Sequence, residues 1–361
     1  MAKLRAVVIG ATGLAGQQFL AALADHPQID ITGLAASPRS AGKTYEEALK
    51  GSSGMVGWFL PEPLPSRFAQ MTVLDGSAVN PADYDLAFSA VESDVARELE
   101  PRLAQSIPVV STASAFRYED DVPLVIPPVN ADHAQLVRLQ QEKRGTRGYI
   151  LPIPNCTTTG LALALAPLKE AFGVKAVMLT SLQAISGAGR SPGVIGLDIT
   201  DNVIPHIPNE EEKVEVEATK ILGRLVDGTV ERLPLKLSAT CTRVAVLEGH
   251  TEAVSVSLGR EASLEDVAEV LRSWKGQEVA RGLPSAPEAW IRLHEDPFRP
   301  QPRLDRDAGN GMVTSVGRLR KDAVLENGIK FVLVSHNTKM GAAKGAILVA
   351  EQLLAQGLMG R

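Results

Sequence analysis

The chain has 361 residues, of which 45% are hydrophobic and 22% charged, and its formal net charge is −5. This composition is typical of a globular protein, and the length favours two domains over a single core. The negative charge argues against non-specific binding to nucleic acids or to anionic membranes.

Several features of the sequence favour a cytoplasmic protein. Residues Met1 to Arg5 lead directly into a strand-like run and lack the apolar region of a signal peptide, and no transmembrane span is evident. Two cysteines, Cys156 and Cys241, are too few for a disulfide framework and fit a reducing compartment. The histidines are scattered without ligand spacing, so we expect no metal site.

The N-terminal stretch has the pattern of a dinucleotide-binding unit. A strand-like run, Leu4–Ile9, is followed by the glycine-rich residues 10–16 and by an apolar helical stretch from Gln17 to Ala24. In this order, glycines allow a tight turn, close approach of a pyrophosphate and close packing of the helix on the strand. We therefore expect a dinucleotide to bind at this turn.

The second predicted strand, Ile29–Ala36, indicates which dinucleotide is bound. An NAD-selective protein carries an acidic residue near the end of this strand for the ribose 2′-hydroxyl. Here the strand runs instead into Ser37, Arg39 and Ser40. An arginine with two hydroxyls suits a 2′-phosphate, so we favour NADP over NAD; the alternative is a solvated loop arginine.

The next elements complete the first domain. Strands are predicted at Thr72–Leu74, Asp85–Ser89, Val109–Ser111 and Leu124–Ile126, and a helix is predicted at Ser93–Leu103. Alternating strands and helices predict a mostly parallel, doubly wound sheet. Ser89 ends one strand at the edge where such sheets bind ligands, so we expect it to line the cleft. Arg117 follows another strand and is positioned to face an anion, although a lone surface arginine is more often solvated.

Cys156 stands between a strand-like run, Tyr149–Ile153, and an apolar helix-like run, Leu161–Phe172. Asn155 and residues 157–159 supply cap chemistry, which places the sulfur at a helix N-terminus. There the helix dipole and free backbone N–H groups favour a thiolate and can hold an oxyanion. We interpret Cys156 as a nucleophile; the alternative, a small buried core residue, is our interpretation of Cys241.

The pattern changes after this helix. A strand, Val174–Gln183, precedes the glycine-rich loop Ser186–Gly193, which suits close approach to a flat nicotinamide ring. A helix is predicted from Asn209 to about Leu225, with acidic residues at its positive end. Glu210 and Lys213 share one face of this helix, as site residues or as a solvated charged pair.

The remaining elements include a candidate for proton transfer. Leu235–Thr242 and Thr251–Leu258 read as antiparallel strands, and His250 follows a glycine at the start of the second. An unperturbed histidine pKa of about 6.5 suits proton transfer near neutral pH, although a structural histidine is the alternative. The last predicted elements are an amphipathic helix at Leu264–Trp274 and a loop at Asp296–Arg306. They are followed by a strand at Lys330–Ser335 and a final helix from His336 onward.

Six motifs occur in order along nearly the whole chain. They are GATGLAG at 10–16, PNCTTTG at 154–160, QAISGAG at 183–189, NEEEK at 209–213, CTRVAVLEGH at 241–250 and HNTKMGAAKGA at 336–346. In this order they resemble motifs of the aspartate-semialdehyde dehydrogenase family, and the sequence PNCTTTG resembles that of its archaeal and fungal branch. Glu248 departs from the aspartate expected before Gly249, which bears only on the fine positioning of His250.

This resemblance implies reversible, NADPH-dependent reduction of L-aspartyl 4-phosphate to L-aspartate 4-semialdehyde with release of phosphate. The reaction is an early step towards lysine, methionine and threonine. By the resemblance, Cys156 is the nucleophile, His250 the acid/base and Gln183 the residue that orients the acyl group. The implied substrate contacts are Arg243 to the α-carboxylate, Glu210 to the α-ammonium, and Arg117, Asn155 and Lys213 to the phosphate. The implied NADP contacts are Gly10, Thr12, Gly13, Ser37, Arg39, Ser40, Gly187 and Asn337. We expect Leu14, Ser89 and Ser186 to contact the cofactor as well.

The expected architecture is that of glyceraldehyde-3-phosphate-dehydrogenase-like proteins. It comprises a Rossmann domain at 1–153, a central α+β catalytic and dimerisation domain at 154–335, and a C-terminal helix at 336–361 that packs back on the first domain. The resemblance also implies a homodimer or homotetramer through the central domain.

Three alternative functions stay open. Two are enzymes of the same superfamily, a malonyl-CoA reductase and an N-acetyl-γ-glutamyl-phosphate reductase, which share the thioester chemistry. Glu210 argues for a substrate with an ammonium group, which malonyl-CoA lacks. The third alternative is a non-catalytic NADP-binding sensor.

Overall fold

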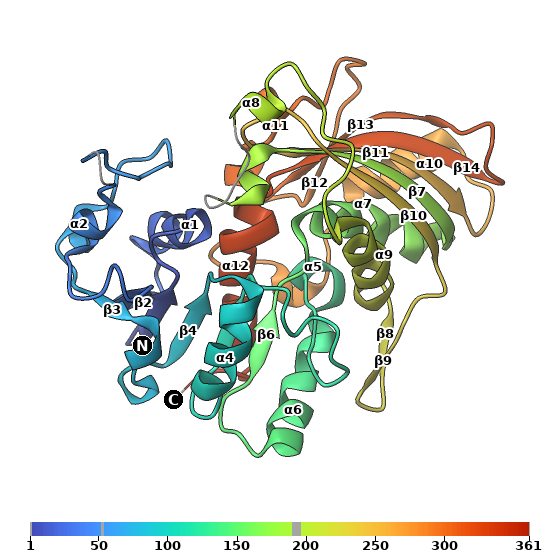
Figure 1. The fold of residues 1–361 in the computed structure, drawn as a ribbon. Helices are drawn as coiled ribbons and strands as arrows, with labels where there is room; N and C mark the ends of the chain where they lie inside the picture. Colours follow the sequence, from blue (N-terminus) through green and yellow to red (C-terminus); the bar gives the residue numbers. More distant parts are fainter. Residues whose placement is uncertain (1, 52–53, 190–195, 361) are drawn as a thin grey trace.

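The computed structural model describes residues 2–51, 54–189 and 196–360, and Figure 1 shows its two sheets. The first sheet is entirely parallel, in the order β3-β2-β1-β4-β5-β6. Its strands are β1 Leu4–Ile9, β2 Ile29–Ala36, β3 Val73–Asp75, β4 Leu86–Ser89, β5 Val109–Ser111 and β6 Ile150–Pro152. The predicted doubly wound Rossmann sheet is confirmed.

Helices cover both faces of this sheet, which is why its strands are rich in apolar residues on both sides. On one face, α1 (Leu14–Leu23) and α12 (Lys344–Ala355) pack in one core cluster with Val8 and Phe88. On the other face, α4 (Ser93–Ala104) packs over Val7 and its neighbours. At its carboxyl end, β6 leads into α7, which packs against the second sheet.

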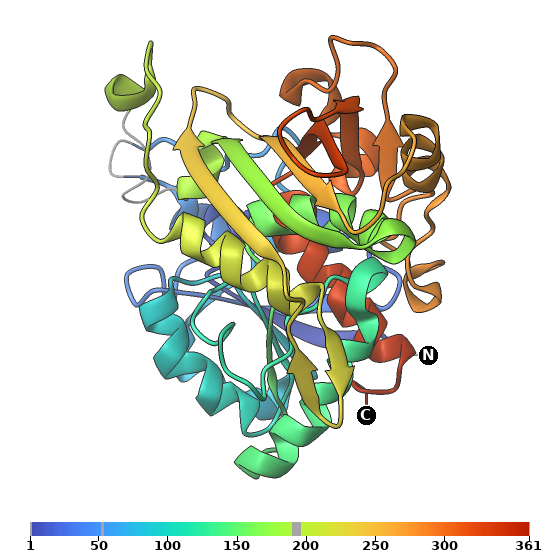
Figure 2. The same cartoon turned by 90° about the vertical axis from the view of Figure 1, so that its right-hand side faces the viewer.

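The second sheet is mixed, in the order β10-β7-β11-β14-β13-β12. Its strands are β7 Val174–Gln183, β10 Lys236–Arg243, β11 His250–Leu258, β12 Ile291–Leu293, β13 Thr314–Lys321 and β14 Gly328–Ser335. The buried face packs on α7, α9 and α10, which span Cys156–Phe172, Glu210–Ile221 and Leu264–Ser273. Figure 2 looks onto the opposite face, where Met178 is 56% and Leu182 38% exposed.

Shorter elements connect these layers. They are α2 Tyr45–Leu49, α3 Ser66–Ala69, α5 Pro127–Asn130, α6 Leu136–Arg144, α8 Gly196–Ile199, α11 Pro302–Asp305, and the hairpin β8 Arg224–Val226 with β9 Thr229–Glu231. Among the described residues, no helix has the length and apolar character needed to cross a membrane.

Three predicted elements differ in the structure. Residues 124–126 form no strand, because the side chain of Asn130 takes the place of a neighbouring strand: its Oδ1 accepts from Ile126 N–H and its Nδ2 donates to Leu124 O. The helix predicted to reach Leu225 ends at Ile221, because the following residues pair into the β8–β9 hairpin. The loop predicted at 296–306 contains the short helix α11.

The strand pairing of the second sheet also differs from the simplest expectation. β10 and β11 run in opposite directions, as predicted, but they do not pair with each other. β7 lies between them, parallel to β10 and antiparallel to β11. This arrangement places the end of β7, the end of β10 and the start of β11 at one edge of the sheet.

After β14 the chain returns to the first sheet. A π-helical turn, Lys339–Ala343, leads into α12, whose Ile347 and Leu353 join the core cluster of β1 and α1. A buried contact of 2.7 Å joins Glu351 Oε1 to His26 Nε2. The boundaries proposed at 153/154 and 335/336 stay predictions.

Candidate active site

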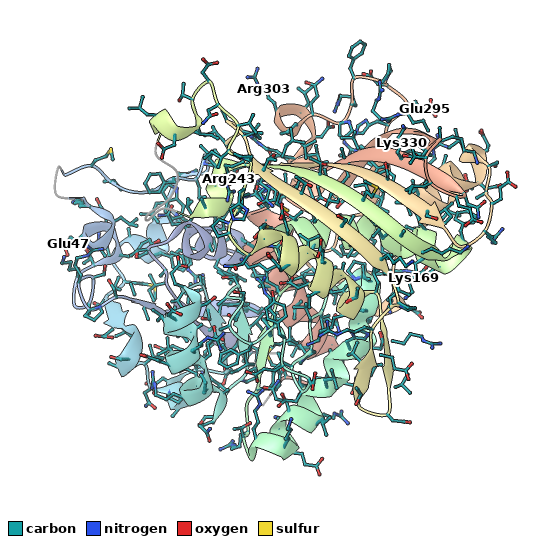
Figure 3. The ribbon with its side chains drawn as sticks, turned by 45° about the vertical axis from the view of Figure 1, so that its right-hand side comes forward. Glu47, Lys169, Arg243, Glu295, Arg303 and Lys330 are labelled. Atoms are coloured by element: carbon teal, nitrogen blue, oxygen red, sulfur yellow. The ribbon has the colours of Figure 1, made fainter. Side chains whose placement is uncertain are left out.

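The topology brings four predicted site residues together at the junction of the two sheets. β6 of the first sheet leads directly into α7, which begins at Cys156. In the second sheet, Gln183 and Arg243 are partners at the carboxyl ends of β7 and β10, and His250 begins the antiparallel β11. Figure 3 shows Arg243 inside the molecule, whereas Glu47 and Glu295 lie at its periphery.

The N-terminus of α7 is capped by the residue before the cysteine. Asn155 Oδ1 accepts hydrogen bonds from the backbone N–H groups of Thr157 at 2.9 Å and Thr158 at 3.2 Å. The predicted cap is thus confirmed. The same bonds engage two of the N–H groups that were expected to hold an oxyanion.

Cys156 and His250 are in direct contact although 94 residues separate them. The cysteine Sγ lies 3.2 Å from His250 Nε2, and the other ring nitrogen, Nδ1, lies 3.1 Å from the backbone nitrogen of Ala184. Because a backbone N–H can only donate, Nδ1 acts as the acceptor and the proton of the neutral ring is on Nε2. Burial, together with the positive charge of Arg243, lowers the pKa of His250 to about 3.

The ionisation of the cysteine differs from the expectation. Burial and, to a smaller extent, the charge of Glu210 raise the pKa of the Cys156 thiol to about 12, although Arg117 and Arg243 act to lower it. The predicted thiolate is therefore not the resting form, since removal of the sulfur from water outweighs the helix dipole. The pair consists of a thiol and a neutral imidazole near neutral pH.

Glu210 is the centre of a polar network beside this pair. Its Oε1 accepts from Asn155 Nδ2 at 2.8 Å and from Gln183 Nε2 at 3.2 Å, and its Oε2 lies 3.5 Å from Lys213 Nζ. The structure therefore joins these four predicted residues through direct contacts. Arg243 Nη1 donates to Ala184 O at 2.8 Å, which places the guanidinium next to the turn that holds His250.

One residue with several contacts in this region was missed by sequence reasoning. Glu217 is completely buried; its Oε1 accepts from Arg117 Nη1 at 3.0 Å and its Oε2 accepts from Asn155 N–H at 2.6 Å. A signal for it was present in the sequence, because Glu217 follows Glu210 by seven residues, or two helical turns on the same face.

The turn between β1 and α1 has the features of a pyrophosphate site. Gly10 has φ of +81°, and a Cβ there would lie 2.2 Å from Ala90 O, so only glycine fits. Gly13 caps α1 without a side-chain acceptor, which leaves the first helical N–H groups for an anion, and Thr12 and Leu14 flank it. Ser89 is buried at the end of the neighbouring strand β4.

The remaining predicted cofactor residues lie in two places. Ser37 and Arg39 are exposed after β2, and Ser40 is buried. Asn337 Nδ2 donates to Ser186 Oγ at 2.8 Å, just after the end of β7.

The turn around Gly187 lies against Arg243 and His250. A Cβ on Gly187 would lie 3.0 Å from Arg243 Nη1 and 3.2 Å from His250 Cε1, which explains a glycine here. Asn337 Oδ1 accepts from Gly249 N–H at 2.8 Å and so ties this region to the start of β11. Residues 190–193 of the predicted glycine-rich loop lie outside the described residues.

Glu248, the departure noted in the sequence, contacts the segment that follows β14. Its Oε1 accepts from Thr338 Oγ1 at 2.7 Å, and its Oε2 lies 3.5 Å from His336 Nε2. Glu248 therefore helps to hold in place the segment that carries Asn337.

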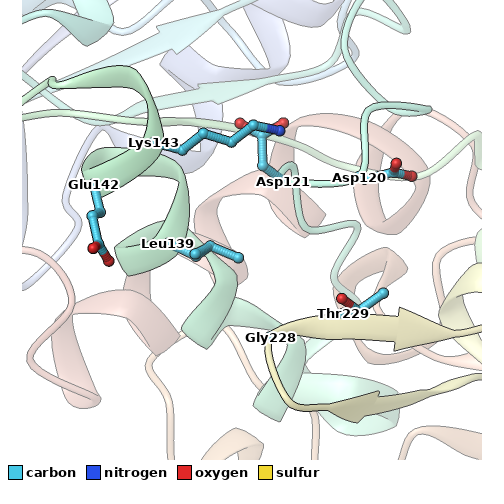
Figure 4. A pocket seen from close by; sticks show the side chains of 7 residues that line it. All are labelled: Asp120, Asp121, Leu139, Glu142, Lys143, Gly228 and Thr229. Carbon is cyan, nitrogen blue, oxygen red and sulfur yellow. The ribbon is translucent and has the colours of Figure 1, made fainter.

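A separate hollow of about 490 Å³ lies between α6, the β8–β9 hairpin and residues 120–121 (Figure 4). None of the predicted site residues lines it. Within residues 2–51, 54–189 and 196–360, no three His, Cys, Asp or Glu side chains are grouped to hold a metal ion.

Comparisons with known proteins agree with this geometry. Residues 5–137 match the family model "Semialdehyde dehydrogenase, NAD binding domain", and residues 165–340 match "Semialdehyde dehydrogenase, dimerisation domain". The aspartate-semialdehyde dehydrogenase of Archaeoglobus fulgidus is 46% identical, over 98% of each chain, and that of Methanothermobacter thermautotrophicus is 44% identical, over 95% of this chain and 97% of its own.

The chain belongs to the aspartate-semialdehyde dehydrogenase family. A crystal structure of the aspartate-semialdehyde dehydrogenase from Candida albicans with NADP superposes with a TM-score of 0.88, at 41% identity and with 99% and 100% of the two chains covered. Archaeal and fungal relatives are the branch that the PNCTTTG motif indicated. The two alternative reductases are not favoured, because these relatives are all aspartate-semialdehyde dehydrogenases.

Proposed function

We propose that the chain catalyses the reversible NADP-dependent conversion of L-aspartyl 4-phosphate to L-aspartate 4-semialdehyde and phosphate. This reaction belongs to the biosynthesis of lysine, through diaminopimelate, and of methionine and threonine. The observation that carries the proposal is the 3.2 Å contact of Cys156 Sγ with His250 Nε2, at the edge where a dinucleotide-binding sheet meets the second sheet. The family membership gives the substrate.

The cofactor residues fit NADP. The uncapped start of α1 at Gly13 suits the pyrophosphate, and Arg39 with its flanking serines suits the 2′-phosphate. Ser186, Gly187 and Asn337 are expected to hold the nicotinamide end, since they lie against Arg243 and His250. When bound, the cofactor supplies or accepts the hydride.

Cys156 performs the covalent step. After the thiol loses its proton to solvent, the sulfur bonds to the acyl carbon, the carbon–oxygen bond to phosphate breaks, and phosphate leaves with the bonding electrons to give a thioester. After reduction of this thioester, the carbon–sulfur bond of the resulting thiohemiacetal breaks and the aldehyde leaves. The positive charges of Arg117 and Arg243 favour the thiolate against the effect of burial.

His250 is best placed to donate a hydrogen bond throughout these steps. Its Nε2–H faces the sulfur, so it stabilises the thiolate and any alkoxide that forms on the carbon attached to sulfur. Protonation of Nδ1 would place its N–H opposite the backbone N–H of Ala184, which already donates to this nitrogen, and two donors repel each other. The geometry therefore supports a donor role for His250 more strongly than a proton-transfer role.

The surrounding charges suit an amino acid that carries a phosphoryl group. Arg243 is assigned to the α-carboxylate, Glu210 to the α-ammonium and Gln183 to the acyl group. Lys213 and Arg117 are assigned to the phosphate, and the buried Nε of Arg117 has no hydrogen-bond partner among the described residues. Asn155 was predicted to join them, but its side chain already bonds Glu210 and the start of α7, which supports a positioning role.

The deciding experiment is phosphate-dependent reduction of NADP by L-aspartate 4-semialdehyde, measured at 340 nm. We expect activity with NADP that is lost by at least about a thousandfold in Cys156→Ser, because the hydroxyl is a poor nucleophile without a dedicated base. Cys241→Ser is the matched control and should retain activity, since Cys241 belongs to the core of the second sheet. Binding of NADP should survive in both variants.

The same assay tests the alternatives. Turnover of malonyl-CoA or of N-acetyl-γ-glutamyl phosphate with NADPH, without turnover of the aspartyl substrate, would replace the substrate and keep the mechanism. NADP binding without turnover of any of the three would support the sensor.

We also infer a homodimer or homotetramer through the exposed face of the second sheet. Met178 and Leu182 present apolar surface there, within the segment that matches a dimerisation domain. Met178→Glu should lower the molar mass measured by light scattering during size-exclusion chromatography. Val324→Glu, in the exposed β13–β14 turn, is the control and should leave it unchanged. If the Val324 variant dissociates, or if the molar mass of the Met178 variant is unchanged, the interface lies elsewhere.

A cytoplasmic location is inferred from the thiols. Cys156 and Cys241 are both free, and Cys156 must stay reduced to act as a nucleophile. Fractionation of cells that express the chain should recover it with cytoplasmic markers, and recovery in an oxidising compartment would contradict this location.

A further inference from the structure

Glu217 connects two parts of the site that come from different sheets. It lies on α9, two turns after Glu210, and no part of its side chain is exposed. Its Oε1 accepts from Arg117 Nη1 at 3.0 Å and from Tyr118 Oη at 3.3 Å, and its Oε2 accepts from the backbone N–H of Asn155 at 2.6 Å. Donors thus approach both oxygens, which is what an ionised carboxylate matches.

The contact with Asn155 acts on the nucleophile. Asn155 is the residue immediately before Cys156 and caps its helix through Oδ1. Its side-chain nitrogen donates to Glu210 and its backbone nitrogen donates to Glu217, so α9 holds the residue from two sides. The position of Cys156 at the start of α7 therefore depends on the docking of α9.

The contact with Arg117 acts on the charge at the phosphate side. The Arg117 guanidinium donates to Glu217 and to Thr112 O, and its buried Nε has no partner among the described residues. Because Glu217 lies 3.0 Å away, the positive charge of Arg117 is largely balanced before an anion binds.

A second contact fixes the same loop. Lys220, one turn further along α9, donates from Nζ to the carbonyl oxygens of Arg117, Glu119 and Val122 at 2.8–3.0 Å. The backbone that carries Arg117 is thereby tied to α9 independently of Glu217. Loss of the Glu217 carboxylate should therefore change the charge and the position of the nucleophile without releasing the loop.

We infer that Glu217 is a positioning residue that holds Cys156 through Asn155 and limits the positive charge that Arg117 presents to an anion. The part about phosphate rests on the proposed function. Glu217 holds the cysteine in place for attack, and its negative charge keeps phosphate from binding too tightly to leave. The two effects act on different kinetic parameters and can be separated.

Two substitutions separate charge from position. Glu217→Gln removes the charge and replaces one of the two acceptor oxygens with an NH₂ donor. That donor would face an N–H group of either Arg117 or Asn155, and the hydrogen bond there would be lost. Glu217→Asp keeps the charge but withdraws the carboxylate by one methylene. Glu215→Gln is the matched control, because Glu215 is on the same helix and its carboxylate accepts a backbone N–H, from Ala239 at 3.0 Å, outside the site.

The first readout is alkylation of Cys156 by anionic iodoacetate and neutral iodoacetamide, followed by mass spectrometry of the Cys156 peptide. We expect Glu217→Gln to raise the ratio of the iodoacetate rate to the iodoacetamide rate at least threefold. Glu217→Asp and Glu215→Gln should keep the wild-type ratio. A purely structural effect would lower both rates together and leave the ratio unchanged, which would overturn the inference about charge.

The second readout is turnover in the semialdehyde assay. Glu217→Gln should lower kcat at least tenfold and should also lower the KM for phosphate. Glu217→Asp should lower kcat without lowering the KM for phosphate. Glu215→Gln should change neither kcat nor this KM. A Glu217→Gln variant that folds, by its thermal melting curve, and keeps the wild-type kcat and alkylation ratio would overturn the inference. If wild type does not turn over the semialdehyde, the proposed function fails, and the alkylation ratio still decides the role of Glu217.

Discussion

The backbone N–H of Ala184 donates to Nδ1 of His250 across 3.1 Å. This one bond determines the tautomer of the ring, because it leaves Nε2 as the nitrogen that carries the proton. Nε2 in turn lies 3.2 Å from the sulfur of Cys156. The pair therefore differs from a thiolate–imidazolium pair, in which both ring nitrogens carry protons.

The pH dependence of thiol reactivity follows from this relationship. The pKa of Cys156 is raised to about 12, so its thiolate fraction grows with pH, and the pKa of His250 is lowered to about 3, so the ring stays neutral. We expect the rate of alkylation by iodoacetamide to rise about tenfold per pH unit between pH 6 and 9. A plateau with an inflection near pH 6.5 would instead show a thiolate–imidazolium pair.

Substitution of His250 distinguishes a hydrogen-bond donor from a proton carrier. Loss of one donor at an oxyanion costs about 10²–10³ in kcat, which we expect for His250→Leu. His250→Gln retains an N–H donor and should be about tenfold more active than His250→Leu. Equal loss in both variants, measured as kcat with saturating semialdehyde and phosphate, would favour proton transfer.

Arg39 should determine the preference for NADP. A hydrogen bond to a charged group contributes about 1.5–3 kcal/mol, or roughly 10–150-fold in affinity, and the exposure of Arg39 favours the lower end. We expect Arg39→Ala to raise the KM for NADP about tenfold and to change the KM for NAD less than about twofold. Lys43→Ala, which removes a nearby exposed cation, should change neither. Similar losses in both variants would indicate general charge attraction.

Gly10 should be far less tolerant of substitution than another glycine with the same backbone conformation. Gly10 and Gly42 have φ of +81° and +79°, but a Cβ on Gly10 would lie 2.2 Å from Ala90 O whereas one on Gly42 would meet nothing within 4 Å. Gly42→Ala should cost about 1–2 kcal/mol from strain alone, and Gly10→Ala at least about 3 kcal/mol. Urea unfolding monitored by circular dichroism compares them, and equal midpoints would contradict the clash.

Local sequence signals predicted those parts of the molecule that depend on neighbouring residues. The β1–glycine–α1 unit and the cap at Asn155 follow from residues within a few positions of one another, and both are present. The false strand at 124–126 also looked apolar enough locally. It fails because Asn130, four residues further on, bonds its backbone, and side-chain hydrogen bonds of this kind leave no periodic signal.

Sequence reasoning could name the candidate site residues but not their contacts. His250 was a candidate for its chemistry, yet its tautomer depends on the end of β7, 66 residues earlier. The raised pKa of Cys156 depends on burial by several elements, which the motif around the cysteine does not encode. Glu217 was overlooked because an acidic residue on a charged helix normally faces solvent, and only the docking of α9 buries it.

The return of α12 to the first sheet affects how the protein is made. Ile347 and Leu353 fill the same cluster as Leu4 and Leu20, and Tyr149 Oη donates to Leu358 O. Because translation proceeds from the N-terminus, one face of the first sheet is covered only in part, by α1, until residues 344–355 have been synthesised. The nucleotide-binding half, although encoded first, is thus among the last parts of the molecule to be completed.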